Sequence, residues 1–211
     1  MVRTKNPAVR TRLIERAAQM LRAREPVTLR SVVRDTGLST MAVYTYFGGM
    51  EGLWQAVRQE GFTRLAAELG TVTRTKDPVR DLTALGAAYV TNALANPDLY
   101  RVMFDATVDL ENPTAADDTL HILVTTIERA QQADRFAPGA DARSLATQCW
   151  AIGHGLVSLV ATGPLPHDTL ALGAPMLVAL FVDAGDTPAT CRDSVGRGWP
   201  FRPPGHDAGK P

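Results

Sequence analysis

The sequence of 211 residues has little cysteine, no net charge and no long apolar run. Its two cysteines, Cys149 and Cys191, are not at a spacing used for metal binding or redox chemistry, so no disulfide framework is expected and a reducing cytosol is favoured. The longest uncharged apolar run, residues 170–182, falls short of the roughly 20 residues that a membrane-spanning helix needs. The first residues contain no apolar signal-peptide core. We therefore expect a cytoplasmic protein without a membrane partner.

Signals for strands and for catalysis are also scarce. The sequence has no long alternating apolar pattern and no Asn-Gly or Asp-Gly hairpin turn, so sheet structure is not expected. It lacks a glycine-rich phosphate loop, a Gly-x-Ser-x-Gly elbow and a His-Glu-x-x-His zinc motif. We therefore expect no cofactor, no metal and no enzymatic activity. An enzyme built around His154 and acidic residues is the rival interpretation, which titratable groups converging in a cleft would favour.

Helix signals, by contrast, recur along the chain. Apolar residues make up 45% of the sequence and charged residues 21%, as in a globular protein, and the apolar residues recur at helical spacing. Because proline suits the first helical position, four pairs of a capping residue and proline predict helix starts: Asn6-Pro7, Asp77-Pro78, Asn96-Pro97 and Asn112-Pro113. We predict an all-α fold of about nine helices, over residues 7–23, 28–35, 39–46, 50–70, 78–95, 97–108, 114–134, 141–162 and 168–184. Pro175 places the continuous part of the last helix after about Gly173, and the Gly- and Pro-rich sequence from residue 187 predicts a mobile tail.

The zero net charge conceals an uneven distribution. Residues 1–60 hold ten arginines and lysines against five acidic residues, a net charge of +5, and the remaining residues carry −5. A basic first quarter attached to an acidic body indicates two separate roles, with the basic part facing a polyanion. Chance scatter of surface charge is the alternative.

The segment that carries this charge has the pattern of a DNA-reading unit. In residues 27–47, Thr28 can cap one short helix, Gly37 suits a tight turn, and Ser39 can cap a second short helix. Two short helices joined by a glycine-containing turn, after an amphipathic helix, are typical of a helix-turn-helix unit. A plain helical hairpin within a larger bundle is the alternative.

The same spacing separates an inner from an outer face of the second short helix. If Val43, Tyr46 and Phe47 are buried, the opposite face would enter a major groove, and the basic residues nearby would lie close to phosphates, Arg34 among them. With no arginine on this face, base readout would rely on threonine hydroxyls and on methyl contacts to thymine. The exposed hydroxyl of Tyr44 suits a phosphate contact, although a half-buried surface tyrosine is also common. The candidate DNA-binding residues are Arg3, Lys5, Thr28, Arg30, Ser39, Thr40, Met41, Tyr44 and Thr45.

Residues 8–53 resemble the DNA-binding domain of the tetracycline-repressor (TetR) family of bacterial transcription regulators. The resemblance is carried by Asp35-Thr36-Gly37-Leu38-Ser39 and Val43-Tyr44-Thr45-Tyr46-Phe47, with Thr28-Leu29 before them and Glu51-Gly52-Leu53 after them. It implies an N-terminal three-helix helix-turn-helix domain followed by a helical-bundle domain that binds a small ligand and forms a homodimer. The expected domains are residues 1–49, residues 50–186, and the tail 187–211.

One position departs from the family pattern. Many members carry a lysine three residues after the phenylalanine of the third helix, where it contacts phosphate, and here that position is Met50. We expect one phosphate contact to be missing, or to be supplied by backbone N–H groups of the fourth helix. This leaves open a small-molecule sensor that has the fold and has lost DNA affinity.

A second resemblance lies in the body of the protein. The residues from Trp150 to Gly155 resemble the Trp-x-x-x-His-Gly signature of one C-terminal subclass of the same family. Trp150 and His154 are four residues apart and share a helix face. The candidate ligand-binding residues are Tyr89, Met103, Phe104, Trp150 and His154, and a place in the plain core is the alternative for each.

Two apolar helices are candidates for the dimer contact, because an interface of four helices needs apolar faces. The candidates are Leu145, Cys149, Ile152, Leu156, Val160, Met176, Leu177, Leu180 and Phe181, and internal core is again the alternative. Together these features predict a homodimeric repressor that leaves a double-stranded DNA operator when a small-molecule effector binds. An activator is the alternative.

Overall fold

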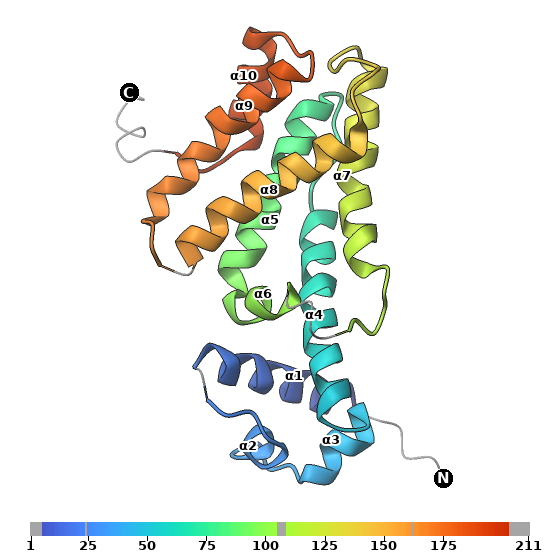
Figure 1. Cartoon of the computed structure of the whole chain (residues 1–211), viewed down its shortest axis with the longest axis vertical. Coiled ribbons are helices and arrows are strands. Elements are labelled where there is room, and N and C mark those ends of the chain that lie inside the picture. The colour runs from blue at the N-terminus through green and yellow to red at the C-terminus, as the bar shows by residue number, and fades with distance from the viewer. Residues whose placement is uncertain (1–5, 24, 105–108, 162, 203–211) are drawn as a thin grey trace. The chain divides into compact units, whose positions relative to one another are not determined.

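The computed structural model describes residues 6–23, 25–104, 109–161 and 163–202, and all regular structure in these ranges is helical (Figure 1). The elements are α1 (Pro7–Arg22), α2 (Leu29–Val33), α3 (Thr40–Phe47), α4 (Met50–Gly70), α5 (Pro78–Ala95), α6 (Pro97–Met103), α7 (Ala115–Gln132), α8 (Ala142–Ala161), the 3-10 helix η1 (His167–Leu172), α9 (Gly173–Asp183) and α10 (Pro188–Gly198). The predicted all-α class is confirmed. The sixth predicted helix extends to residue 108, and its last four residues lie outside the described residues.

The proline pairs predict three helix starts correctly. α1, α5 and α6 begin at the proline of each pair, and the side chain of Asn6 accepts the N–H of Ala8 at 3.0 Å. The fourth start is displaced to Ala115, because the side chain of Asn112 accepts the N–H of Thr114 and forms a turn before the helix. The helix that contains Pro175 begins at Gly173 after a 3-10 turn, as expected.

The chain divides into two compact units. Unit 1 comprises Met1–Arg64 and Asn96–Ala116, and unit 2 comprises Leu65–Ala95 and Asp117–Pro211. The units do not coincide with the predicted domains 1–49 and 50–186, because most of α4 and all of α6 belong with α1. Arg64 shows why: its guanidinium donates to Glu60 at 2.9 Å, to Glu15 of α1 at 3.1 Å and to Asn96 at 3.0 Å.

Unit 1 has a single apolar core. The buried stripe of α1 packs against one buried residue from each short helix, against α4 and against the inner side of α6. The core residues include Leu13, Ile14, Ala17, Met20, Val32, Val43, Leu53, Val57, Leu99 and Val102. The core therefore fixes α2 and α3 on a frame made of α1, α4 and α6.

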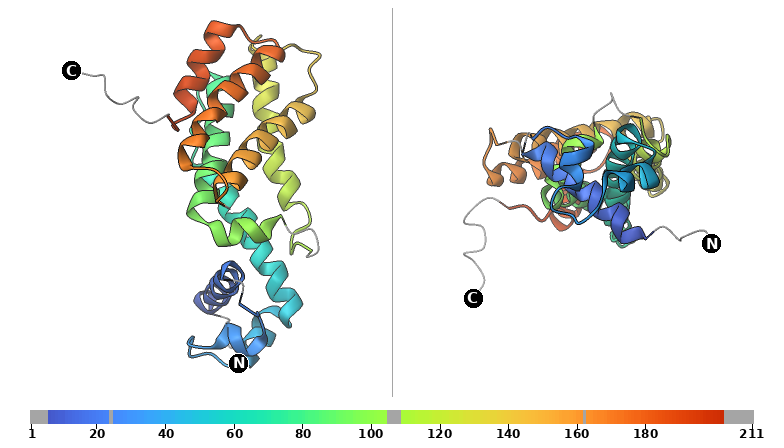
Figure 2. Two further views of the ribbon diagram at one scale, coloured as in Figure 1. Left: turned by 60° about the vertical axis from the view of Figure 1, so that its left-hand side comes forward. Right: turned by 90° about the horizontal axis from the view of Figure 1, so that it is seen from below.

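Unit 2 is organised around α5, which is buried along most of its length. α8 and α10 pack on α5, and α9 packs on both α8 and α10 (Figure 2). Phe136 and Phe181 meet at a ring-centroid distance of 5.4 Å within this core.

Residues Pro188–Gly198, which the composition assigns to a mobile tail, form the helix α10. Cys191 and Val195 of α10 face the core, and Trp199 is 1% exposed, with its Nε1 donating to the Leu170 carbonyl at 2.9 Å. The prediction is wrong for α10 because three apolar residues spaced by four are enough to bury one side of a helix. Residues 203–211 of the predicted tail lie outside the described residues.

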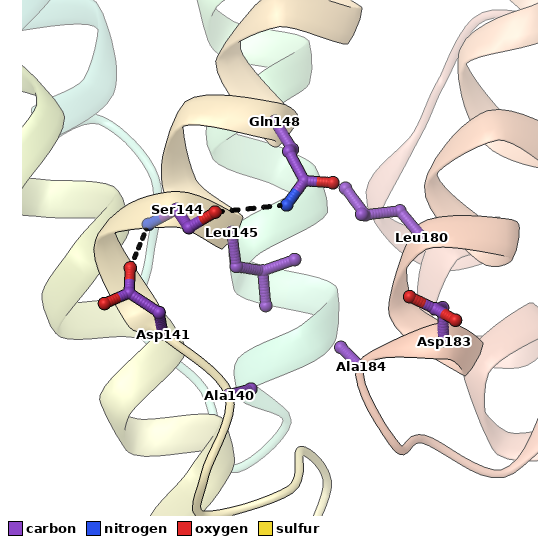
Figure 3. A pocket seen from close by; sticks show the side chains of 8 residues that line it. All are labelled: Ala140, Asp141, Ser144, Leu145, Gln148, Leu180, Asp183 and Ala184. Carbon is purple, nitrogen blue, oxygen red and sulfur yellow. Dashed lines mark hydrogen bonds between the residues drawn. The ribbon is translucent and has the colours of Figure 1, made fainter.

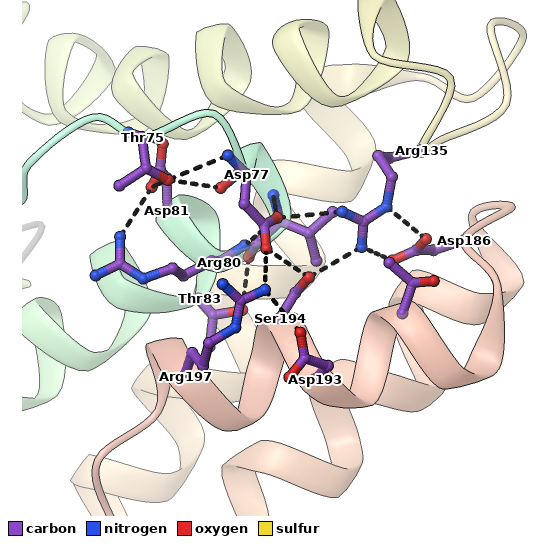
Figure 4. A network of polar contacts seen from close by, with 12 residues as sticks. Thr75, Asp77, Arg80, Asp81, Thr83, Arg135, Asp186, Asp193, Ser194 and Arg197 are labelled. Carbon is purple, nitrogen blue, oxygen red and sulfur yellow. Dashed lines mark hydrogen bonds and ion pairs between the residues drawn. The ribbon is translucent and has the colours of Figure 1, made fainter.

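A polar network fastens α10 to the rest of unit 2 (Figure 4). Arg135, between α7 and α8, donates to Asp186 at 2.8 and 2.7 Å and to Asp77 at 3.2 Å. Ser194 and Arg197 of α10 donate to Asp77 at 2.7 and 2.8 Å. Asp77 also accepts two backbone N–H groups at the start of α5, so one carboxylate joins three parts of the unit.

Candidate nucleic-acid interface

α3 has one inner and one outer side, as the sequence predicts. Val43 is fully buried, while Tyr46 and Phe47 are half-buried. On the outer side Met41 is 64% exposed and Tyr44 is 49% exposed. Met41 and Tyr44 are three residues apart and so share this side of the helix, which makes the outer side of α3 a candidate contact surface.

The hydroxyl-bearing residues around α3 differ in what they offer a partner. Thr45 is exposed, but its hydroxyl donates to the carbonyl of Met41 at 2.8 Å. Thr40 is half-buried. Ser39 is exposed and occupies the N-cap position as predicted, yet its side chain makes no cap hydrogen bond. The predicted contact residues of α3 therefore lie on or next to the exposed side.

Local backbone geometry holds α2 and α3 in place. Thr28 and Ser31 form a reciprocal cap, in which each side chain accepts the other's backbone N–H at 3.2 and 2.8 Å. Asp35 and Gly37 take left-handed conformations, with φ of 62° and 71°, in the turn that follows. Thr28 is exposed, and its hydroxyl oxygen already accepts the N–H of Ser31. Its predicted DNA contact would have to form in addition to this hydrogen bond.

The link from α3 to α4 depends on glycine at two positions, Gly48 and Gly52. Gly48 ends α3 in a left-handed conformation, and its N–H bonds to the Tyr44 carbonyl at 2.9 Å. A Cβ on Gly52 would collide with the carbonyl oxygen of Phe47. Met50 is the first residue of α4, in place of the lysine that many members of the resembled family carry.

The basic residues of the first 60 positions are partly used within unit 1. Arg10 donates to Glu111 at 2.7 Å, Arg12 donates to the Thr36 carbonyl at 3.1 Å, and the Nε of Arg58 donates to the Met103 carbonyl at 3.0 Å. Arg30 and Arg34 are exposed beside the turn. The predicted contacts from Arg3 and Lys5 lie outside the described residues.

The candidate ligand residues separate into two groups. In unit 2, the hydroxyl of Tyr89 on α5 lies 2.8 Å from Nδ1 of His154 on α8. Trp150 packs edge-on to the imidazole of His154, with a ring-centroid distance of 5.9 Å. Burial lowers the pKa of His154 below its ordinary value, which favours the neutral imidazole. Tyr89 is buried, whereas Trp150 is partly exposed.

Met103 and Phe104 belong to unit 1 and are not brought to the Tyr89 group within either unit. Met103 is 1% exposed, and a Cβ on Gly61 would lie 2.8 Å from its Cβ. Phe104 packs against Phe62 and Tyr100. The side chain of Met103 lies in the close contact between α4 and α6, as the plain-core alternative expects, and its ligand role stays a prediction.

Five of the predicted dimer residues are buried inside unit 2, where they present little surface to a second copy: Leu145, Cys149, Leu156, Leu177 and Phe181. Their spacing marks the inward stripes of α8 and α9, which pack against their own chain. The other four are half-buried or exposed: Ile152, Val160, Met176 and Leu180.

The outward stripes of α8 and α9 are more open. A small hollow of about 170 Å³ between the start of α8 and the end of α9 is lined by Gln148 and Asp183 among others (Figure 3). Gln148 is one end of a row of outward residues at helical spacing along α8, and Asp183 is one end of a similar row along α9. Because both residues line the hollow, the two rows face the same side of unit 2 at this point. We call this surface the α8–α9 face; its residues are Gln148, Ile152, Gly155, Leu159, Leu172, Met176, Ala179 and Asp183.

Residues 82–180 match the family model of the tetracyclin repressor-like C-terminal domain. This match covers the body of the chain, whereas the helix-turn-helix pattern covers its beginning. The chain therefore resembles the TetR family in its first helices and matches the C-terminal model of that family in its body. The finer resemblance to the Trp-x-x-x-His-Gly subclass of TetR proteins stays a prediction.

Solved structures share this TetR fold over most of the chain. A protein of unknown function from Rhodococcus sp. RHA1 is 26% identical, with a TM-score of 0.64 over 92% of this chain and 98% of that one. A tetR-family regulatory protein from Rhodococcus RHA1 is 21% identical, with a TM-score of 0.70 over 85% and 98%. RolR in complex with resorcinol is 19% identical, with a TM-score of 0.59 over 92% and 96%. No curated protein matches the chain.

The part of the chain that the structure describes contains neither a cluster of metal ligands nor a membrane-spanning helix. Within it, no three His, Cys, Asp or Glu side chains gather in a way that could hold a metal ion. No helix in the same ranges is long and apolar enough to cross a membrane. The matched family model is that of a repressor-like domain, and the fold is shared with a tetR-family regulatory protein.

Proposed function

We propose that this chain is a homodimeric repressor that binds an operator through α3 and releases it when a small molecule binds unit 2. The observation that carries the proposal is the outer side of α3, where Met41 and Tyr44 remain exposed opposite the buried Val43. A helix that follows a tight turn and presents such a side fits the major groove.

The charges around α3 support contact with a phosphate backbone. Arg30 on α2 and Arg34 after it are exposed, and they flank the reading helix without lying on it. Contacts to phosphate set register and orientation, whereas the helix side chains meet the base edges. The hydroxyl of Tyr44 is suited to a further phosphate contact.

The α8–α9 face supports the homodimer. Leu159, Leu172 and Met176 are large apolar residues that remain exposed on it. Gly155 has no side chain and has open space beside it, since a Cβ built on it meets nothing within 4 Å, and Ala179 is also small. Two copies of this face would pair about a two-fold axis as a four-helix interface.

The group of Tyr89, Trp150 and His154 supports an effector site in unit 2. It combines two aromatic rings with a polar imidazole, which suits a small ligand that has an apolar body and a polar group. RolR, which shares the fold, holds resorcinol. An effector releases DNA only if it binds the free conformation more tightly than the DNA-bound one, and α4, which has residues in both units, is the element through which we expect that change to pass.

A binding assay tests the proposal directly. Full-length protein is used to select duplexes from a random 20-base-pair library, and the enriched duplex is then compared with a scrambled duplex by fluorescence anisotropy across a salt series. We expect the affinity for the selected duplex to be at least about a thousandfold higher than the affinity for the scrambled one. Equal, weak and steeply salt-dependent binding of both would report phosphate attraction alone and would overturn the proposal.

Release is tested with the same duplex. Resorcinol and a panel of related small phenols are added to the complex at fixed salt, and the anisotropy should fall for a compound that also raises the melting temperature of the free protein. A compound that stabilises the protein while leaving DNA affinity unchanged would contradict release by an effector.

A further inference from the structure

The reading helix lacks the side chains that identify bases by paired hydrogen bonds. α3 has the sequence TMAVYTYF, which contains no charged residue and no amide. In the major groove, guanine is identified mainly by arginine or lysine, adenine by asparagine or glutamine, and cytosine by a carboxylate. None of these side chains is available on α3.

The structure further reduces the number of hydrogen bonds that the side chains of α3 can donate to DNA bases. The hydroxyl proton of Thr45 is donated to the Met41 carbonyl at 2.8 Å, so Thr45 offers a partner its methyl group and an oxygen that can only accept. The other hydroxyls at the outer side, on Ser39, Thr40 and Tyr44, are single groups that can act as donor or acceptor. A single hydroxyl of this kind discriminates poorly between bases.

What the outer side does offer is apolar surface. Met41 is the most exposed large apolar residue among the described residues, and Thr45 lies one helical turn along the same side. The C5 methyl of thymine is the apolar feature of the major groove that such side chains can contact.

We infer that Met41 and the methyl group of Thr45 read thymine through its C5 methyl, so that thymine methyl groups, rather than purine hydrogen-bonding edges, define the operator under α3. This inference rests on the proposed function, since it names what the proposed reading helix recognises. Arg30 and Arg34 then supply affinity that does not depend on sequence.

The test removes one methyl group at a time from the DNA. In the duplex selected by the wild-type protein, each thymine is replaced in turn by deoxyuridine, and in separate duplexes each purine is replaced by its 7-deaza analogue, which lacks the N7 acceptor. We expect one or more uracil replacements in each half-site to weaken binding about fourfold per methyl lost, because that is the effect of burying one such group. The 7-deaza replacements should leave the affinity unchanged.

Variants of Met41 assign the effect to its side chain. Met41→Ala should bind the thymine duplex about as weakly as the wild-type protein binds the uracil duplex, and should no longer respond to uracil at that position. Met41→Gln keeps the length of the side chain but adds an amide, so selection with this variant should shift the preferred base towards adenine. Because Met41 is exposed, both variants should unfold at the wild-type temperature, which a thermal melt verifies.

Two results would overturn the inference. The first is sequence-specific binding that no uracil replacement weakens. The second is specific binding that a 7-deaza replacement weakens instead, which would show that hydrogen bonds to purines carry the readout. If selection yields no sequence that binds better than random DNA, the proposed function itself fails and the inference falls with it.

Discussion

Gly173 packs directly against the indole ring of Trp199, so closely that a Cβ at this glycine would lie 2.6 Å from Cε2 of the ring. The glycine is the first residue of α9, and the tryptophan directly follows the last residue of α10. The indole is enclosed and bonds to the Leu170 carbonyl, so it has no room to move aside. This contact therefore joins the start of α9 to the end of α10.

Replacing Gly173 with alanine should destabilise the protein. The added methyl overpacks the indole, and we expect a loss of about 1–3 kcal/mol in the free energy of unfolding, measured by urea titration. Gly196→Ala on α10 is the matched control, since its Cβ would meet nothing within 4 Å. That change should be neutral or slightly stabilising, because alanine favours a helix over glycine. A Gly173→Ala protein as stable as the wild type would show that the contact can relax.

Asp77 should make the stability of unit 2 sensitive to acid. Burial alone would raise the pKa of Asp77, but the hydrogen bonds from Ser194 and the Arg80 backbone, with the charges of Arg135 and Arg197, hold that pKa below its ordinary value. The stabilisation is therefore fully present above the unfolded-state pKa of about 3.9 and is lost as the pH falls through the lower folded-state pKa.

The measurement is urea unfolding at intervals from pH 6 to pH 2.5. Asp77→Asn should be less stable than the wild-type protein at pH 6, and the difference between the two should shrink as the pH falls below about 4. Asp193→Asn is the control, since its carboxylate is exposed and pairs with Arg197. Parallel curves for the wild type and Asp77→Asn would show that the Asp77 charge does not stabilise the fold.

Local signals in the sequence predict unit 1 better than they predict unit 2. The turn at Gly37 and the cap at Thr28 depend on residues a few positions apart, so one segment contains all the information for them. α10 depends on contacts with α5 and α9, which the sequence does not display. A signal was nevertheless available there: Thr187-Pro188 is another pair of a capping residue and proline, and Cys191, Val195 and Trp199 recur every four residues.

The dimer residues show a different limit of sequence reasoning. The apolar positions of α8 and α9 indicate that a helix side will be buried, but they do not say whether its own chain or a second copy covers it. Leu156 and Leu177 pack inside unit 2, while Leu159 and Met176 face outwards. The candidate ligand residues are subject to the same ambiguity, since a buried side chain such as Met103 can belong to a core or line a pocket.

The Tyr89–His154 hydrogen bond should be measurable as stability. Tyr89→Phe removes it with little change in volume, and we expect a loss of about 1 kcal/mol in the free energy of unfolding. A second prediction concerns the pH dependence of stability. Because burial lowers the pKa of His154 in the folded protein, His154 takes up a proton in the unfolded chain at a higher pH than in the folded one. The wild-type protein should therefore lose stability from about pH 6.5 downwards, and His154→Gln should reduce that loss. An unchanged pH profile in His154→Gln would contradict this assignment.

The α8–α9 face should hold the homodimer together. Met176→Asp places a charge on this face, where pairing of two copies would remove it from water, so we expect the dimer dissociation constant to rise about a hundredfold or more. Analytical ultracentrifugation over a concentration series measures the change. Since Met176 is exposed in the single chain, the variant should remain folded, which circular dichroism verifies. Thr125→Asp, at an exposed position of α7 outside the face, is the matched control and should leave the dimer intact.

The same variant links assembly to DNA binding. A dimer places two copies of α3 on half-sites about one helical turn apart, so each half-site adds to the affinity for the whole operator. Met176→Asp should therefore bind a duplex with both half-sites little better than a duplex with one, while the affinity for a single half-site stays at the wild-type value. Loss of binding to the single half-site as well would mean that the substitution damages the reading unit. An intact Met176→Asp dimer would instead show that the two chains pair through another surface.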